Sequence, residues 1–357
     1  MRMKLRGLVE EVIWQGGNEI LLFPFHLFSL GYLFLVQTRH TLYRFGWLKS
    51  RRLPCRVISV GNITLGGTGK TTVTLYIAHL LREKGKRVAI LSRGYRGKVK
   101  DKVRVVADGR EMICDDPREL GDEPVLLAKK LRNIPVLAGR DRFEAGKKAL
   151  DFEPDVMVLD DGFQHLKLER DLDIVLLDSQ VGFGNGHLLP RGILREPRKN
   201  LKRADVFLLI RRGNELSSSS PLETELNLYG KPIFHASYQP LSLKSLDGER
   251  KLEISILKGK KVSALSSIAN PKSFRSLLSS LGAQVVRELA FPDHHLYSQR
   301  DLRRIERELL GMDLLVTTEK DRVKLGSFLP EKTPIFSLEI GLKVEEEEEF
   351  SRILTEK

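Results

Sequence analysis

Residues Val57–Thr72, VISVGNITLGGTGKTT, combine a short apolar run, a glycine-bearing turn and a stretch with helical composition. Gly66, Gly67 and Gly69 allow the backbone N–H groups of the turn to approach an anion closely. A helix N-terminus directly behind the turn also favours negative charge. This order of strand, turn and helix is typical of a phosphate-binding loop. A plain glycine-rich turn before an ordinary helix is the alternative.

The side chains of this loop suggest specific roles toward a nucleotide. Lys70 is placed to reach the β- and γ-phosphates, and the Thr71 hydroxyl to bind Mg²⁺. The strict pattern G-x-x-x-x-G-K-[ST] would have glycine at position 64, where this chain has Thr64. We predict that the nucleotide contacts the loop residues Thr64, Gly66, Gly67, Thr68, Gly69, Lys70, Thr71 and Thr72.

The composition is that of a soluble globular chain with room for two domains: 357 residues, 41% hydrophobic and 30% charged. The formal net charge of +13 suggests an anionic partner, such as a nucleotide or an anionic membrane. The 60 Lys and Arg residues are spread along the chain without an aromatic-interleaved basic motif, so we expect no nucleic-acid partner. Cys55 and Cys114 form no C-x-x-C pair, which fits a reduced cytosolic setting and does not fit a structural zinc site.

The most apolar stretch is Ile20–Val36, ILLFPFHLFSLGYLFLV. It is slightly short for a membrane-spanning helix, which needs roughly 20 residues, and Pro24, His26 and Ser29 interrupt it. A basic and aromatic stretch follows, with Arg39, His40, Tyr43, Arg44, Phe45, Trp47, Lys49, Arg51 and Arg52. This pattern favours a helix that contacts an anionic leaflet from one side. A core helix packed on the following domain and a single membrane span are the alternatives.

Beyond the loop, apolar runs alternate with amphipathic stretches, which predicts an α/β fold with a mostly parallel sheet. We divide the chain into a membrane-contact segment 1–54, a phosphate-loop domain 55–210, a linker 211–222 and a smaller α/β domain 223–357. We expect a peripheral protein that is a monomer.

Val156–Leu159, an apolar run, is followed directly by Asp160 and Asp161. A buried strand that ends in a carboxylate beside a phosphate-binding loop is what Mg²⁺ binding in nucleotide enzymes requires. Two adjacent carboxylates strengthen this prediction, although a strand that ends in an ordinary turn is the alternative.

Two other pairs of charged residues leave their roles open. Asp122 and Glu123 stand before a predicted helix, where they could cap the helix or act in chemistry. Arg195 and Glu196 could be an anion clamp and a further carboxylate near Mg²⁺, or a surface ion pair.

The histidines of FPDHH, His294 and His295, offer no metal-ligand spacing, so a base or base-orienting role is better motivated. The alternative is that one histidine enters a helix and the other is solvated.

Other nucleotide-binding classes fit less well. A GTPase needs N-K-x-D, and the stretch Thr318–Asp321 reads TEKD. The string GGTGKTT is similar to the loop of membrane-associated partition ATPases, but those carry Lys before the two glycines, where this chain has Leu65. A partition-type ATPase remains the alternative function.

Several stretches together closely resemble the tetraacyldisaccharide 4′-kinase family. They are GNITLGGTGKT, SRGYRGK, GDEP, VLDDGFQH, RDLDIVLLD, GNGHLLPRGILREP, SIANPKSF, FPDHH and TTEKD, in family order from about residue 55 to 325. The resembled family has Thr at the position of Thr64. This chain differs at Arg191 and Ile193, where the family usually has Ala and Pro.

The resemblance implies ATP-dependent phosphorylation of the 4′-hydroxyl of an acylated glucosamine disaccharide 1-phosphate in lipid A synthesis. It also implies ATP and Mg²⁺ as cofactors, an active site between two domains, and a location on the cytoplasmic face of the bacterial inner membrane.

By the same resemblance, Asp122 is the base toward the sugar hydroxyl, supported by His294, and Lys70 contacts the transferred phosphate. The further implied assignments are Thr71, Asp160, Asp161 and Glu196 around the metal, and Tyr95, Gln164 and Arg195 in the nucleotide cleft.

Overall fold

The structure is a computed structural model that describes residues 19–94, 103–211, 220–325 and 334–356. Most of the predicted linker (212–219) and the first part of the membrane-contact segment (1–18) lie outside the described residues. The described chain forms one 13-stranded sheet. Its order is β11 (Gln284–Ala290), β10 (Lys261–Ser266), β12 (Leu314–Thr318), β13 (Ile335–Val344), β8 (Ile233–Ser245), β7 (Val206–Arg211), β6 (Leu172–Asp178), β1 (Arg56–Gly61), β5 (Val156–Asp160), β2 (Val88–Ser92), β4 (Pro135–Gly139) and β3 (Val103–Asp108), and β9 (Lys251–Leu252) pairs with β8.

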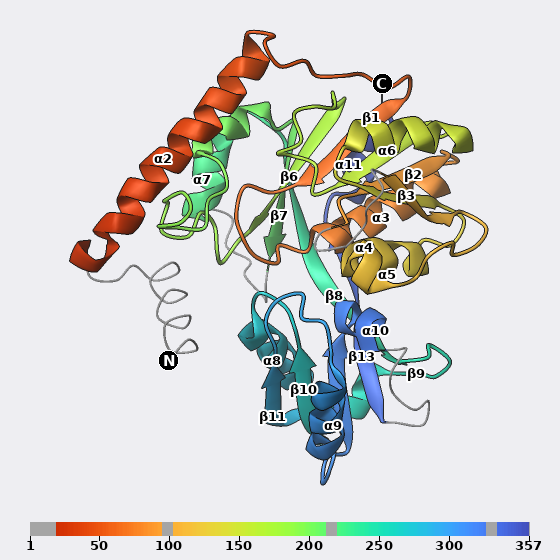
Figure 1. The fold of residues 1–357 in the computed structure, drawn as a ribbon. Helices are drawn as coiled ribbons and strands as arrows, with labels where there is room; N and C mark the ends of the chain where they lie inside the picture. The colour runs from red at the N-terminus through yellow and green to blue at the C-terminus, as the bar shows by residue number, and fades with distance from the viewer. Residues whose placement is uncertain (1–18, 95–102, 212–219, 326–333, 357) are drawn as a thin grey trace.

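The predicted mostly parallel α/β sheet is confirmed: the antiparallel pairs among the described strands are β3–β4, β8–β13 and β8–β9. We call the part of the sheet made of β1 to β7 the P-loop unit. We call the part made of β10, β11 and β12 the C-terminal unit. Figure 1 shows the first above the second. Within the P-loop unit, β1 lies between β5 and β6 and runs parallel to both. Val60 pairs with Asp160, so the carboxylate that ends β5 lies beside the start of the glycine-bearing turn.

Helices cover both faces of the sheet. They are α2 (Glu19–Arg44), α3 (Lys70–Glu83), α4 (Pro117–Leu120), α5 (Asp122–Lys130), α6 (Arg142–Ala149), α7 (Pro221–Asn227), α8 (Pro271–Ser280), α9 (Gln299–Glu308), α10 (Glu319–Leu325) and α11 (Glu347–Thr355), with short 3-10 helices η1 (Leu150–Phe152), η2 (Arg198–Arg203) and η3 (Ile254–Leu257). Alternation along β1 explains the two layers. Ile58 and Val60 join the core beneath α3, α5 and α11, while Val57 joins the core beneath α6.

Strand β8 connects the two units. Its first part pairs with β7, from Ile233 to Ser237, and the stretch from Ala236 to Ser245 pairs antiparallel with β13. Figure 1 shows β8 and β13 running side by side from one unit into the other. The chain therefore enters the C-terminal unit along one strand and returns along its neighbour.

The hydrophobic cores place the boundary between the units differently from the sequence prediction of a linker at 211–222. Leu222 and Leu226 of α7 are buried in the P-loop unit. Phe350 and Leu354 of α11, at the other end of the chain, are buried there too. Which unit α11 covers depends on contacts between residues distant in sequence, which a local pattern does not encode.

Helix α2 lies along one side of the P-loop unit (Figure 1) and is joined to it by polar contacts. Ser29 is buried, and its Oγ donates to the Leu188 carbonyl at 2.7 Å. The two positions at which this chain differs from the resembled family lie in the same region. The Arg191 side chain contacts His26, the Arg191 backbone N–H donates to Ser29 Oγ, and Ile193 is buried. No helix among the described residues is both long and apolar enough to cross a membrane.

We expect Gly61→Ala to destabilise the protein. A Cβ on Gly61 would lie 2.5 Å from the Phe163 Cβ and 2.8 Å from its backbone nitrogen, so β1 or the chain at Phe163 would have to move. The free energy of unfolding should fall by roughly 1–3 kcal/mol, as in other overpacked cores.

Chemical denaturation measures this difference. Gly31→Ala in α2 is the control, because a Cβ there meets nothing within 4 Å and alanine favours the helix. An equal loss of stability in both variants would contradict the close approach of β1 to Phe163.

Candidate active site

The predicted phosphate-binding loop connects β1 to α3. Gly69 is the N-cap of α3, with φ 75° and ψ 24°, a left-handed conformation that favours glycine. No side chain in the described part of the chain caps this end of α3, so its first amide groups are available to an anion.

Asn62, which follows β1, holds the side chains of the loop together. Its Nδ2 donates to Thr68 Oγ1 at 2.8 Å and to Thr64 Oγ1 at 3.3 Å. Its Oδ1 accepts from Lys70 Nζ and from Arg195, both at 3.2 Å. The Thr64 hydroxyl thus contacts Asn62, whereas a glycine at this position would have no side chain to make this contact. The sequence analysis missed Asn62, although it lies within the stretch GNITLGGTGKT.

Asp161 lies between two cations of the site. Arg195 donates to both of its oxygens, at 2.8 and 3.2 Å, and Lys70 Nζ lies 3.7 Å from Oδ1. Burial raises the pKa of Asp161, but Lys70 and Arg195 outweigh burial and hold the pKa below its ordinary value. The carboxylate is therefore ionised and balances the two cations.

Asp160 has a different environment although it is the adjacent residue. It is buried, its Oδ1 accepts from Thr74, and its Oδ2 has no hydrogen-bond partner among the described residues. Burial and the nearby charges of Glu123 and Asp161 raise the pKa of Asp160 to about 7. An unpaired buried carboxylate oxygen beside a phosphate-binding loop fits a hard divalent cation such as Mg²⁺.

Glu196, the third predicted metal carboxylate, faces a different set of partners. Its Oε2 lies 2.6 Å from Arg203, 2.8 Å from Asn200 and 3.0 Å from His40 Nε2. In the described part of the chain, Glu196 does not gather with Asp160 and Asp161 into a compact group of ligands. The sequence could not show this. His40 lies in α2, far from Glu196 along the chain, and Arg203 contacts Glu196 because η2 folds back toward it.

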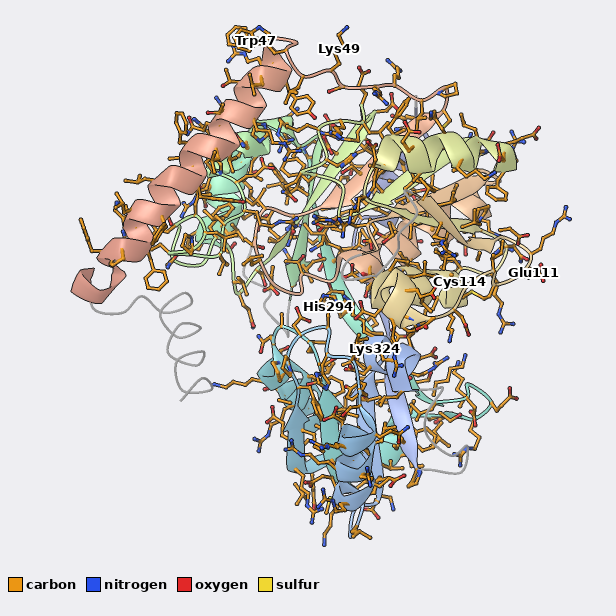
Figure 2. All side chains as sticks on the ribbon, in the orientation of Figure 1. Trp47, Lys49, Glu111, Cys114, His294 and Lys324 are labelled. Carbon is orange, nitrogen blue, oxygen red and sulfur yellow. The ribbon has the colours of Figure 1, made fainter. Side chains whose placement is uncertain are left out.

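Asp122 and His294 meet at the junction of the two units. His294 Nδ1 lies 2.9 Å from Asp122 Oδ1 and 3.0 Å from Oδ2. Figure 2 shows His294 where the P-loop unit faces the C-terminal unit, with Lys324 nearby. His294 has φ 57°, an unfavourable conformation for a residue with a Cβ, and such strain is common where a side chain is held for function.

The contact between these two side chains shifts the pKa of each toward its charged form. Burial raises the pKa of Asp122, but the hydrogen bond with His294 and the charges of Lys320 and Lys324 hold it below its ordinary value. Burial lowers the pKa of His294, and the contact with Asp122 raises it by more, so the pKa lies above that of an ordinary histidine.

Lys320 of TTEKD joins this pair to the carboxylates of β5. Its Nζ contacts Glu123 Oε1 at 2.6 Å across the junction of the units. Burial lowers the pKa of Lys320, but Glu123, Asp122 and Asp160 together raise it above its ordinary value. The stretch TTEKD excludes a GTPase and contributes to the family resemblance, but nothing in the sequence places Lys320 opposite Glu123.

The remaining predicted residues are placed as follows. Gln164 Nε2 donates to the Asn62 carbonyl at 2.9 Å, so Gln164 adjoins the loop. Thr71 and Thr72 lie in the first turn of α3, where Thr71 is buried. Tyr95 lies outside the described residues.

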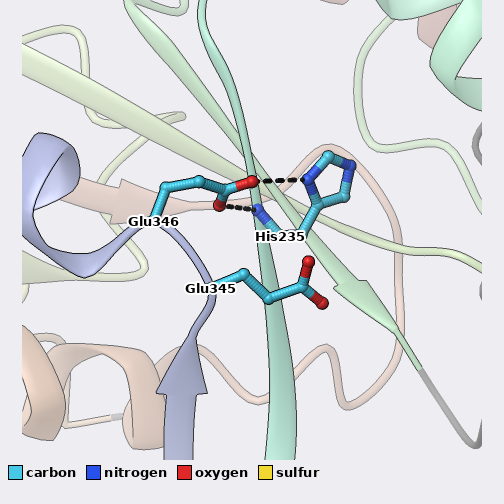
Figure 3. Close-up of side chains that lie close together, drawn as sticks. All are labelled: His235, Glu345 and Glu346. Carbon is cyan, nitrogen blue, oxygen red and sulfur yellow. Dashed lines mark hydrogen bonds and ion pairs between the residues drawn. The ribbon is translucent and has the colours of Figure 1, made fainter.

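A second cluster of possible metal ligands lies away from this site. Among the described residues, His235, Glu345 and Glu346 are the one group of at least three His, Cys, Asp or Glu side chains whose ligand atoms all lie within 4.8 Å of one another (Figure 3). His235 contacts Glu346 through Nδ1 and Glu223 through Nε2, each at 3.2 Å, and Arg211 pairs with Glu345. Since these groups already contact one another, the cluster joins α7, β8 and the chain just before α11.

We expect the His294 pKa to fall in the variant Asp122→Asn. Without the carboxylate, burial and the charge of Lys320 disfavour the charged imidazole, and only the more distant Asp293 favours it, so the pKa should fall by at least about one pH unit. NMR titration of the histidine ring signals measures this. His79 serves as an internal reference, because burial lowers its pKa and Asp122 is not among its neighbours. The pKa of His79 should not change in the variant. An unchanged His294 pKa would show that Asp122 does not favour the protonated imidazole.

Comparison with known proteins places this geometry in a family. The profile described as tetraacyldisaccharide-1-P 4′-kinase matches residues 19–357. The chain is 44% identical over 342 residues to the tetraacyldisaccharide 4′-kinase of Syntrophus aciditrophicus, covering 92% of this chain and 91% of the relative. It is 38% identical over 367 residues to the enzyme of the same name from Desulfatibacillum aliphaticivorans, covering 99% and 98%.

The fold is also similar to a solved structure. The crystal structure of LpxK from Aquifex aeolicus, described as an "apo" form in complex with ATP, matches with a TM-score of 0.75 and 37% identity over 93% of this chain and 97% of that chain. Because the family profile covers nearly the whole chain and the relatives share its full length, this chain belongs to the tetraacyldisaccharide-1-P 4′-kinase family.

Proposed function

We propose that this kinase transfers the γ-phosphoryl group of ATP to the 4′-hydroxyl of a tetraacylated glucosamine disaccharide 1-phosphate at the cytoplasmic face of the bacterial inner membrane. Family membership supports the reaction. The observation that carries the site assignment is the contact between Asp122 of the P-loop unit and His294 of the C-terminal unit. Lys320 and Glu123 link this pair electrostatically to Asp160 beside the phosphate-binding loop.

The Asp122–His294 pair would accept the proton of the acceptor hydroxyl. A sugar hydroxyl is too weak an acid to ionise at neutral pH, so a positioned base lowers the barrier as the hydroxyl attacks. The new bond joins the 4′-oxygen to the γ-phosphorus, and the bond from that phosphorus to the β–γ bridging oxygen breaks. The proton of the hydroxyl passes to the ionised carboxylate of Asp122, which the hydrogen bond with His294 holds in place.

The cations and the amide groups of the loop would hold the phosphates. Lys70 and Arg195 now share the carboxylate of Asp161 as their counter-ion, so both can turn to incoming phosphate oxygens. Asp160 and the Thr71 hydroxyl are the groups that would hold Mg²⁺, which supplies neutralisation of the developing charge when bound.

The contacts of α2 support a role for this helix near the site. Tyr32 donates its hydroxyl to the Arg195 carbonyl at 2.9 Å, and Arg39 donates to the Gln164 carbonyl at 3.0 Å. His40 pairs with Glu196. One face of α2 thus reaches three of the predicted site residues.

The opposite face of α2 supports the membrane contact. Its exposed apolar residues are Phe23, Leu27, Phe28, Leu30, Phe34 and Leu35. Phe28 and Phe34 are 69% and 70% exposed, which is costly in water but favourable in a bilayer interface. Figure 2 shows Trp47 and Lys49 just beyond the end of α2, an aromatic and a basic residue of the kinds that anchor proteins at anionic membranes.

A transfer assay tests the reaction. Purified protein is incubated with γ-labelled ATP, Mg²⁺ and the acylated disaccharide 1-phosphate in mixed micelles, and label should appear on the lipid at the 4′ position. Lys70→Ala should abolish transfer because the loop loses its phosphate-binding cation. An acceptor already phosphorylated at the 4′ position should remain unlabelled. Phosphate release without labelled lipid, stimulated by membranes alone, would instead favour a partition-type ATPase.

We expect Asp122→Ala to lower kcat by roughly 10²–10⁴ while ATP binding is retained, since a general base is lost. If Asp122 and His294 act as one unit, the double variant with His294→Ala should be no slower than the slower single variant. Steady-state kinetics of the three variants measure this. Rate losses that multiply in the double variant would contradict a shared role.

We expect Phe28→Ser combined with Phe34→Ser to weaken binding to phosphatidylglycerol-containing vesicles by about tenfold or more, because each buried aromatic side chain contributes on the order of 1.5–3 kcal/mol. Vesicle sedimentation measures the affinity. Val286→Ser combined with Leu310→Ser, exposed apolar residues of the C-terminal unit, is the matched control and should bind as the unchanged protein does. Equal affinities for both double variants would contradict a membrane contact through α2.

A further inference from the structure

Tyr238, a residue of β8, reaches the phosphate-binding loop from the strand that joins the two units. Its hydroxyl donates to the Thr68 carbonyl at 2.7 Å. Its contact with the loop spans 170 positions in the chain and can be seen only in the folded protein.

The direction of this hydrogen bond matters for the adjacent amide. The peptide bond between Thr68 and Gly69 is not among the cis bonds of the described chain, and in a planar trans peptide the C=O and N–H groups point in opposite directions. A tyrosine that holds the Thr68 carbonyl on one side therefore turns the Gly69 N–H to the other side. No described residue accepts a hydrogen bond from that N–H.

The fit between the two residues is close. A Cβ on Gly69 would overlap the Tyr238 hydroxyl, so any side chain at this position would displace the ring. Tyr238 itself packs against the core beneath α3 and pairs with Leu342 of β13. The ring is thus held by the sheet, and the loop peptide is held by the ring.

We propose that Tyr238 is a positioning residue for phosphate binding: its hydroxyl fixes the Thr68–Gly69 peptide so that the Gly69 N–H faces the phosphates of the bound nucleotide. This rests on the proposed function only in that the loop binds a nucleotide. Tyr238 does not touch the phosphates in this role but acts through the backbone. Its place on β8, one position beyond the last pair with β7, makes the loop depend on the strand that carries the C-terminal unit.

The variant Tyr238→Phe tests the proposal because it keeps the ring and removes only the donor. Dissociation constants are measured for ATP and for inorganic tripolyphosphate by calorimetry or competition. Both should rise, by the same factor of roughly three to ten, the amount expected for one hydrogen bond. KM for ATP should rise by a similar factor, while KM for the acceptor lipid stays constant.

Tyr229→Phe is the matched control. The Tyr229 hydroxyl also donates to a backbone carbonyl, that of Arg198, at 2.9 Å, and it lies away from the loop. It should change thermal stability by a similar amount and leave both dissociation constants unchanged.

The outcomes separate the alternatives. Unchanged binding of both ligands in Tyr238→Phe would overturn the proposal. Weaker binding of ATP but not of tripolyphosphate would overturn it too, since it would place Tyr238 against the base or the sugar. Equal weakening in the Tyr229 variant would reduce the effect to general stability. Because these are binding measurements, they are independent of whether the unchanged protein labels the lipid.

Discussion

Strand β8 is 13 residues long, and its two ends pair with partners in different units. Backbone N–H and C=O groups in a sheet must be paired, so the register of β8 with β7 and with β13 fixes how the C-terminal unit stands against the P-loop unit. The contact of His294 with Asp122 and that of Lys320 with Glu123 depend on this arrangement, because each joins residues of the two units. The same strand carries Tyr238 to the loop. A family with this architecture can bind ATP in one unit and complete the site from the other.

Charge balance governs the arrangement of the site. Asp161 neutralises Lys70 and Arg195, whereas Asp160 forms no ion pair with a described residue and has a raised pKa. The two neighbouring carboxylates therefore differ in role: one pairs with protein cations, and the other is suited to a metal ion. A nucleotide brings phosphates to the cations and a magnesium ion to the carboxylates, so ligand binding replaces one balanced set of charges with another at little electrostatic cost. Glu196 is held apart by Arg203 and His40, which ties it to α2.

Helix α2 shows that polar residues in an apolar stretch can have a second role. Ser29 and His26 weaken the segment as a membrane span, and in the fold they are the residues that bind it to the loop around Arg191. The sequence offered a surface helix and a packed helix as alternatives, and the structure combines features of both. One face packs on the P-loop unit, and the other exposes large apolar side chains. The choice depended on which face of the helix meets protein, which hydrophobicity alone does not determine.

The sequence by itself determined the local features: the phosphate-binding loop before α3, the carboxylates at the end of β5 and most strands of the parallel sheet. These follow from residue order, because glycine, apolar alternation and capping act over a few positions. It also predicted the pairing of Asp122 with His294, but through family resemblance and not through spacing. Only the tertiary structure decided that Asn62 organises the loop and that α11 returns to the first unit. Such contacts join residues distant in sequence, and their energy depends on burial and on partners that no local pattern encodes.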